Sequence, residues 1–205
     1  METTASIPTS ILRQGRIIMN EPAAGLRANL LELLQSVPSS MLQSGPVEKA
    51  RAIFLLCWLH AVLTQRLRFA PLAFTKLYDF NDADFNAALG RLDAWINQAA
   101  RSKTHLDPSD FPWAALKIAI AEYAFGGRID IDRDREVLNS FVDHLFRSEA
   151  FDLDFAMTKT GFKGPDQTTW LDFLAWAAGL PEKEPPSLLG LPAFATKVLA
   201  VQDGN

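Results

Sequence analysis

The chain has 205 residues, of which 48% are hydrophobic and 21% are charged, and its formal net charge at pH 7 is −4. This composition is typical of a globular core and excludes an intrinsically disordered chain. The negative charge argues against nucleic acid or an anionic membrane as the main partner. Cys57 is the single cysteine, so no disulfide can form within the chain, which suits a reducing, intracellular compartment.

The first residues, METTASIPTS, contain neither a basic start nor an apolar run, so no signal peptide is expected. Residues 16–20 (RIIMN) are rich in β-branched side chains and precede the turn-forming EPAAG, a pattern that predicts a short strand. A lone strand leaves its backbone hydrogen-bonding groups without a neighbour. We therefore expect its partner strands to belong to a larger protein that contains this chain.

The next segment predicts an amphipathic helix over residues 25–36, with Leu26, Leu30, Leu33 and Leu34 on one face. Pro38 ends it, because proline forces the preceding residue out of the helical region.

Residues 51–74 (RAIFLLCWLHAVLTQRLRFAPLAF) form the stretch around which the other helices are expected to pack. Residues 53–63 are apolar except for His60, so a helix here is apolar on every side and must be buried. The run is shorter than the about 20 residues that cross a bilayer, which favours a core helix that ends before Pro71. The side chains expected in the structural core, with His60 as a structural histidine, are Phe54, Trp58, His60 and Leu63.

Three further helices follow in the sequence. Asn81 is the predicted N-cap of the first, and Asp82 and Asp84 stand in its first turn. Pro112 opens the second, which Gly126 and Gly127 are expected to end as a left-handed stop. The third begins near Asp132. The expected core positions of the first and third helices are Phe85, Leu89, Leu92, Ile96, Ala99, Val137, Leu138, Phe141, Val142 and Leu145.

Periodicity fades after Ser148, and Gly161, Gly164 and Pro165 indicate a loop. Thr169, three residues before Asp172, predicts the cap of a helix that Gly179 ends. Residues 182–187 (EKEPPS) read as a linker, and a final short helix is expected over residues 194–201.

Motifs for catalysis are absent from the sequence. Neither G-x-x-x-x-G-K-S/T nor G-x-G-x-x-G nor H-E-x-x-H occurs, which argues against an ATPase or a metalloprotease. Residues 130–136 (DIDRDRE) resemble the start of a calcium loop, but Arg135 and Phe141 stand where that loop needs Gly and Glu. Carboxylates at the start of a helix explain this run, and those at 79–84, better than a metal site does. Arg128 has two interpretations: a surface arginine that pairs at a helix end, or a residue at a seam between subunits or domains.

Several segments, in this order, resemble the cytoplasmic dynein heavy chain: 11–30 (ILRQGRIIMNEPAAGLRANL), 66–74 (RLRFAPLAF), 78–85 (YDFNDADF), 111–117 (FPWAALK), 123–134 (YAFGGRIDIDRD) and 186–199 (PSLLGLPAFATKVL). The resemblance is to the sixth AAA+ module of the motor ring, chiefly its helical lid. It implies a mainly α fold, with the strand at 16–20 left over from the missing large subdomain. Residues 1–24 would end that subdomain, residues 25–181 would form the lid, and residues 182–205 would begin the C-terminal region.

The same resemblance implies a non-catalytic, mechanical role in a minus-end-directed microtubule motor of the cytoplasm and cytoskeleton. The lid would pack the sixth module against the first and transmit ring motion driven by ATP. No cofactor is expected in this stretch, because ATP and Mg²⁺ would be bound by other modules of the heavy chain, which is a dimer on microtubules. The implied partners are neighbouring AAA+ modules and the C-terminal region.

In this picture Arg128, Gly126 and Gly127 are candidate residues of the seam between modules. A free-standing helical interaction module derived from such a lid is the alternative. That module would have to cover its exposed apolar surface, for instance by forming oligomers or by exchanging its N-terminal strand.

Overall fold

The computed structural model describes residues 9–16, 25–101, 103–152, 154–166 and 169–203, and its regular structure is helical, which confirms the mainly α fold class. In these residues no strand forms, and an isolated antiparallel bridge joins Ala156 to Lys163. The strand expected at 16–20 lies outside the described residues, apart from Arg16. The elements in chain order are α1 (Thr9–Gln14), α2 (Leu26–Ser36), α3 (Ser39–Gln43), α4 (Glu48–Leu67), α5 (Asp82–Ala100), η1 (Pro108–Asp110), α6 (Trp113–Ile118), η2 (Ala119–Ala124), η3 (Gly126–Arg128), α7 (Asp132–Leu145), η4 (Ser148–Phe151), α8 (Trp170–Ala178), η5 (Pro186–Leu189) and α9 (Ala195–Asp203).

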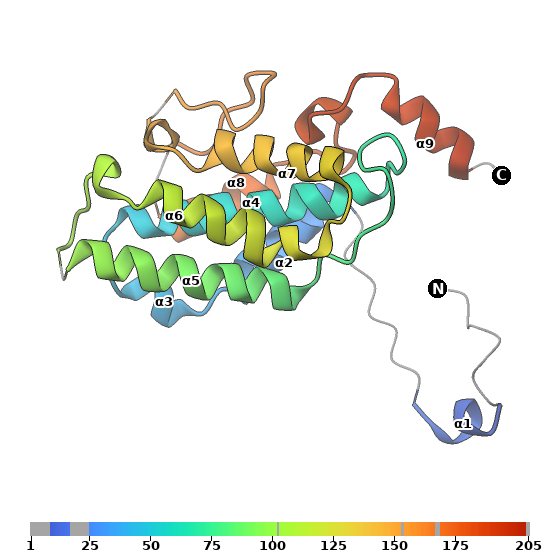
Figure 1. Ribbon diagram of the computed structural model, residues 1–205, viewed down its shortest axis with the longest axis horizontal. Coiled ribbons are helices and arrows are strands. Elements are labelled where there is room, and N and C mark those ends of the chain that lie inside the picture. Colours follow the sequence, from blue (N-terminus) through green and yellow to red (C-terminus); the bar gives the residue numbers. More distant parts are fainter. Residues whose placement is uncertain (1–8, 17–24, 102, 153, 167–168, 204–205) are drawn as a thin grey trace.

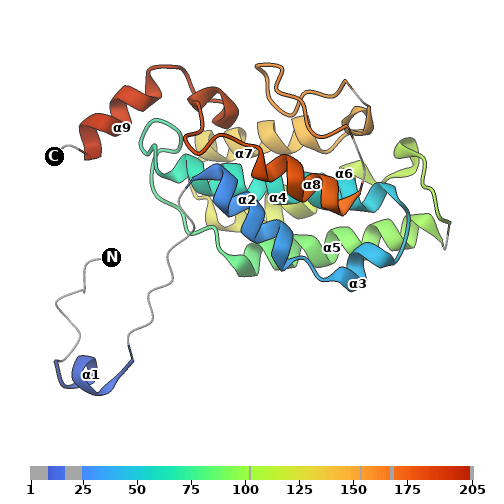
Figure 2. The ribbon, with the colours of Figure 1, turned by 180° about the vertical axis from the view of Figure 1, so that it is seen from behind.

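Helix α4 runs through the centre of the molecule, with α5 and α7 on one side and α2 and α8 on the other (Figures 1 and 2). Every residue from 51 to 63 is buried, as expected for a helix that is apolar all round. The helix ends at Leu67, before Pro71, as predicted. Across the described part of the chain, no helix combines the length and the apolar character that a membrane span requires.

Aromatic side chains join α4 to the elements behind it. Phe54 stacks on Phe173 of α8 with ring centroids 4.6 Å apart, and Trp58 meets Trp176 at 5.9 Å. Such pairs add about 0.5–1.5 kcal/mol each to the free energy gained by burial. The His60 ring packs between Phe85 and Phe125, although its Nδ1 has no hydrogen-bond partner among the described residues.

Helix α5 begins and packs as the sequence predicts. The Asn81 side chain accepts from the backbone N–H of Ala83 and Asp84, and the Asp84 carboxylate accepts from the N–H of Asn81 in return. This reciprocal cap fixes the first turn. The expected core positions Phe85, Leu89, Leu92 and Ile96 are buried, whereas Ala99 is half-buried.

The helix after Pro112 does not end at a left-handed glycine, contrary to what the sequence predicted. Helix α6 continues as a π-helical turn, η2, in which the N–H of Phe125 donates to the carbonyl of Ile120 at 3.1 Å. Neither Gly126 nor Gly127 adopts a positive φ, so neither is a left-handed stop. A β-carbon on Gly126 would lie 1.8 Å from the carbonyl oxygen of Ala121. Glycine is therefore required because the wide turn brings two backbone segments together, not because of its conformational freedom.

The last third of the chain packs against the far side of α4 and along α7. Thr169 caps α8 by accepting from the N–H of Asp172, and Gly179 follows its last residue, both as predicted. In α7, Leu138, Val142 and Leu145 are buried, while Val137 and Phe141 are half-buried. The segment after 182 is not extended throughout, because η5 and α9 form within it and Leu188, Leu189, Leu191 and Ala195 join the core. The proposed domain boundary near residue 182 stays a prediction.

Candidate functional site: the Arg128 corner

Arg128 lies in the turn η3, immediately after the π-helical segment, and reaches across to the start of α5. Its Nε is 2.6 Å from the Oδ2 of Asp84, and its guanidinium is 3.7 Å from the Oδ2 of Asp79. The hydrogen bond to Asp84 raises the pKa of Arg128, so the arginine stays charged at neutral pH. We call Arg128, Asp79, Asn81 and Asp84 the Arg128 corner.

Asp84 serves two partners in this corner. Its carboxylate closes the cap of α5 on Asn81 and also accepts from Arg128. The Asp84 side chain is 11% exposed, whereas that of Arg128 is 37% exposed. The buried carboxylate therefore anchors an arginine that still faces solvent. The capping explanation of the acidic cluster at 79–84 is consistent with these contacts, and Arg128 supplies a cation to it.

A second anchor fixes the loop between α4 and α5. Both Asp134 oxygens lie 3.0 Å from the backbone N–H of Thr75, the Thr75 hydroxyl donates at 2.9 Å, and the Tyr78 hydroxyl donates at 2.7 Å. Burial, together with Asp134, raises the pKa of Tyr78, which keeps its hydroxyl protonated as a donor. Asp130 pairs with Lys76 at 2.6 Å, which lowers the pKa of Asp130.

The acidic run at 130–136 thus does more than begin α7. Asp132 and Asp134 stand in the first turn, as the sequence predicts. In addition, Asp130 and Asp134 tie down residues 75–78. Within the described ranges, no three His, Cys, Asp or Glu side chains are grouped so that they could hold a metal ion.

Apolar side chains are exposed in both segments that the corner joins. Leu77, two residues before Asp79, is 72% exposed, and Tyr123, five residues before Arg128, is also 72% exposed. The Tyr123 ring lies 5.8 Å from the guanidinium of Arg91 on α5. A charged corner whose two segments also carry exposed apolar side chains has the composition of a protein-contact surface.

Comparison with known proteins identifies the fold. The family model of the dynein heavy chain AAA lid domain matches residues 49–195. The chain belongs to this family. The chain is 40% identical to the cytoplasmic dynein heavy chain of Drosophila melanogaster over all of its own length, and 36% identical to that of Dictyostelium discoideum over 97%. The Neurospora crassa cytoplasmic heavy chain is 37% identical over 100% of the chain. The chain spans only 4–5% of the length of these relatives.

The residues predicted to form a seam are brought together on one turn of the dynein lid. Arg128 projects from η3 onto α5, Gly126 sits against Ala121, and Gly127 follows it without a close contact of that kind. Their role between modules stays a prediction. The core residues predicted alongside them, Phe54, Trp58 and Leu63, are buried in the middle of α4.

Sequence reasoning missed a set of charged side chains that are buried on α4. Lys49 is 1% exposed, and its Nζ contacts Asp93 at 2.8 Å and Asn97 at 3.3 Å on α5. Arg51 donates to the carbonyls of Ala150 and Pro165, each at 2.8 Å. Burial lowers the pKa of Arg51, an effect that Asp166 opposes.

Arg66 completes this set at the other end of α4. One signal could have revealed all three residues. A helix whose every side is buried leaves no solvent-facing position for a charge, so charges within its span must have buried partners.

Proposed function

We propose that the chain is the helical lid of the sixth AAA+ module of a dynein heavy chain, a minus-end-directed microtubule motor of the cytoplasm. It packs the sixth module against the first and helps to transmit ring motion driven by ATP. The lid is non-catalytic, and ATP and Mg²⁺ are bound by other modules of the heavy chain, which acts as a dimer. The observation that carries this proposal is the lid-family match over residues 49–195, joined to alignment with cytoplasmic heavy chains along the whole chain.

The internal construction of the lid supports a mechanical role. A part that transmits motion must move as one body, and close-packed interiors with low compressibility do so. Helix α4 packs against α2, α5 and α7, and buried charges fix the segments around it: Lys49 holds α5, and Arg51 holds η4 through Ala150 and the loop that contains Pro165. These contacts connect distant parts of the chain through a single rigid helix.

The Arg128 corner is our candidate for the contact with the neighbouring module. Its arginine is held in place by Asp84 and remains partly exposed, and the segments that meet at the corner also carry the exposed side chains of Leu77 and Tyr123. Arginine and tyrosine are enriched at interfaces because each combines a large contact area with directional polar groups.

The test compares Arg128→Ala with Asp84→Asn in the dynein heavy chain that carries this lid. Both substitutions weaken the same ion pair inside the lid, but only Arg128→Ala also removes the exposed guanidinium. We expect Arg128→Ala to reduce the ratio of microtubule-stimulated to basal ATPase activity more than Asp84→Asn does. An equal reduction in both variants, matched by equal loss of thermal stability, would show that Arg128 acts only within the lid.

A free-standing interaction module is the second candidate, and exposed apolar side chains such as Ile118, Tyr123 and Leu171 favour it. The two functions predict different sizes for the native polypeptide. Peptides from α4 that co-migrate with a very large chain in a source-cell extract support the motor. Migration near 22.7 kDa supports the module.

A further inference from the structure

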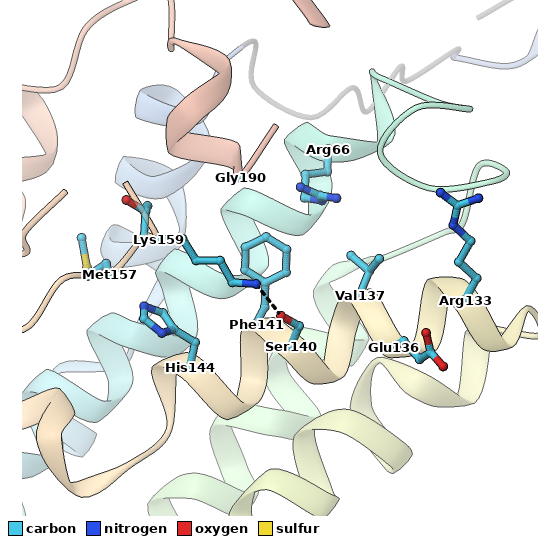
Figure 3. Close-up of a pocket in the computed structure, with 11 residues that line it drawn as sticks. Arg66, Arg133, Glu136, Val137, Ser140, Phe141, His144, Met157, Lys159 and Gly190 are labelled. Atoms are coloured by element: carbon cyan, nitrogen blue, oxygen red, sulfur yellow. Dashed lines mark hydrogen bonds between the residues drawn. The ribbon is translucent and has the colours of Figure 1, made fainter. Parts of the chain in front are cut away.

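A groove of about 360 Å³ runs along α7 and shares no lining residue with the Arg128 corner (Figure 3). It lies between α7, residues 157–159 and Gly190. We call it the α7 groove. Its volume is within the range of pockets that hold ligands or partner side chains. The residues that line it are Arg66, Arg133, Glu136, Val137, Ser140, Phe141, His144, Met157, Thr158, Lys159 and Gly190.

The middle of the groove is apolar. Val137 and Phe141, one turn apart on α7, are half-buried, and the buried Met157 lines the end of the groove beside His144 (Figure 3). The guanidinium of Arg66, which also lines the groove, lies 5.0 Å from the centroid of the Phe141 ring. Half-buried apolar side chains of this kind gain free energy when an apolar partner covers them.

Exposed positive charge flanks this apolar middle. Arg133 and Lys159 are exposed, and neither forms an ion pair with a carboxylate of the described residues; Lys159 only donates to the Ser140 hydroxyl at 3.4 Å. Arg66 likewise has no ion pair there, although Asp134 acts on it from a distance. Glu136 is the one acidic residue among the lining residues.

His144 lines the same groove and adds no positive charge to it. Its Nε2 lies 2.8 Å from the carbonyl oxygen of Ala156, so this nitrogen donates. Burial lowers the pKa of His144, and the charges of Arg147 and Lys159 lower it further, against the effect of that hydrogen bond. The ring is therefore neutral at pH 7 and does not offset the cations of the groove.

We propose that the α7 groove binds an extended polypeptide segment in which two acidic residues flank an apolar one. The distance along α7 from Arg133 to Ser140, where Lys159 docks, is on the order of 10 Å at 1.5 Å per residue. In an extended segment alternate side chains face the same way, so three of them occupy five residues and span about 13 Å at about 3.3 Å per residue, which matches this distance once the reach of the long Arg133 and Lys159 side chains is added. The acidic side chains meet Arg133 and Lys159, and the apolar one covers Val137 and Phe141. Binding of this segment does not require the proposed contact at the Arg128 corner.

The test is a titration of the 205-residue chain with the peptide acetyl-Glu-Ser-Leu-Ser-Glu-amide, followed through the ¹³C-labelled methyl group of Met157. A saturable shift of this resonance is expected. The counterpart peptide with Lys in place of Glu should bind at least tenfold more weakly, and raising the salt from about 50 to 200 mM should weaken the acidic peptide severalfold, because exposed charges are screened. Replacing the central Leu by Ser should also weaken binding.

Charge-reversal variants locate the site. Lys159→Glu and Arg133→Glu should each weaken binding about fivefold, since both side chains are exposed and neither supports the fold. Lys103→Glu, an equally exposed change outside the groove, should leave the affinity unchanged. The proposal is overturned if the Met157 resonance does not respond to the acidic peptide, if the Lys peptide binds equally well, or if the two groove variants bind like Lys103→Glu.

Discussion

Arg66, near the end of α4, donates a hydrogen bond to the backbone carbonyl of Leu189, which lies 123 residues further along the chain. It donates a second one to the carbonyl of Ala73 at 3.0 Å, and its guanidinium faces the rings of Phe74 and Phe141 at 5.5 and 5.0 Å. Burial lowers the pKa of Arg66 to about 10, which leaves it protonated at neutral pH. One buried cation therefore holds the loop after α4, helix α7 and η5 together.

We expect Arg66→Met to lower the free energy of unfolding by about 2–4 kcal/mol, because two carbonyls lose their donor. Amide hydrogen exchange at residues 188–191 should accelerate before the rest of the core does. Arg68→Met is the control: Arg68 is exposed and only reaches the Gln65 side chain at 3.4 Å, so the change should stay within about 0.5 kcal/mol. Urea denaturation followed by circular dichroism measures both, and equal effects would contradict the anchoring role.

Gly126→Ala should destabilise the lid strongly, by about 3 kcal/mol or more, because its β-carbon would overlap the carbonyl oxygen of Ala121. Gly90→Ala offers the opposite case. Gly90 lies in the exposed part of α5 with no atom within 4 Å of an added β-carbon, so alanine should stabilise the helix by about 0.5–1 kcal/mol. The melting temperature should therefore fall in Gly126→Ala and rise in Gly90→Ala. A tolerated Gly126→Ala would show that the π-helical turn relaxes.

The buried ring of His60 should make the lid sensitive to acid. Burial lowers the pKa of His60 from 6.5 to about 4, although Asp82 and Asp84 act in the opposite direction. Between these two values the unfolded chain binds a proton that the folded chain does not, so the free energy of unfolding falls as the pH falls. The full effect is on the order of 3 kcal/mol.

Urea denaturation at pH 7 and at pH 4.5 measures this loss. His60→Leu should remove most of the loss in unfolding free energy that arises between pH 6.5 and 4. His144→Gln is the comparison, because the pKa of His144 is also lowered but its ring is only half-buried, so it should remove a smaller part. An unchanged pH dependence in His60→Leu would place the acid sensitivity elsewhere.

Asp134→Ala should free the loop at residues 75–78 and lower the free energy of unfolding by about 2–4 kcal/mol. The reason is that the Thr75 N–H and the Tyr78 hydroxyl would be left without their acceptor. Asp132→Ala is matched in position, since both residues stand in the first turn of α7, but Asp132 is exposed. Its loss should cost only the interaction with the helix dipole, about 0.3–1 kcal/mol. Similar costs for the two variants would rule out the anchor.

The sequence by itself indicated α2, α4, α5, α7 and α8 and the centre of the fold. The apolar run from Ile53 to Leu63 can be buried only as a central helix, and local chemistry places the caps at Asn81 and Thr169 because those hydrogen bonds join residues two or three positions apart. The order of motifs also indicated the dynein family, which the lid-domain match over residues 49–195 confirmed.

Only the tertiary structure decided which distant residues meet. Sequence spacing could not reveal that Arg66 pairs with Leu189, that Asp134 holds Thr75, or that Gly126 is required by a π-helical turn. Each depends on the path of the chain between the partners, and local periodicity carries no information about that path. A charge on a buried helix must find a partner, but the fold alone selects which one, because only packing brings the two atoms within hydrogen-bond distance.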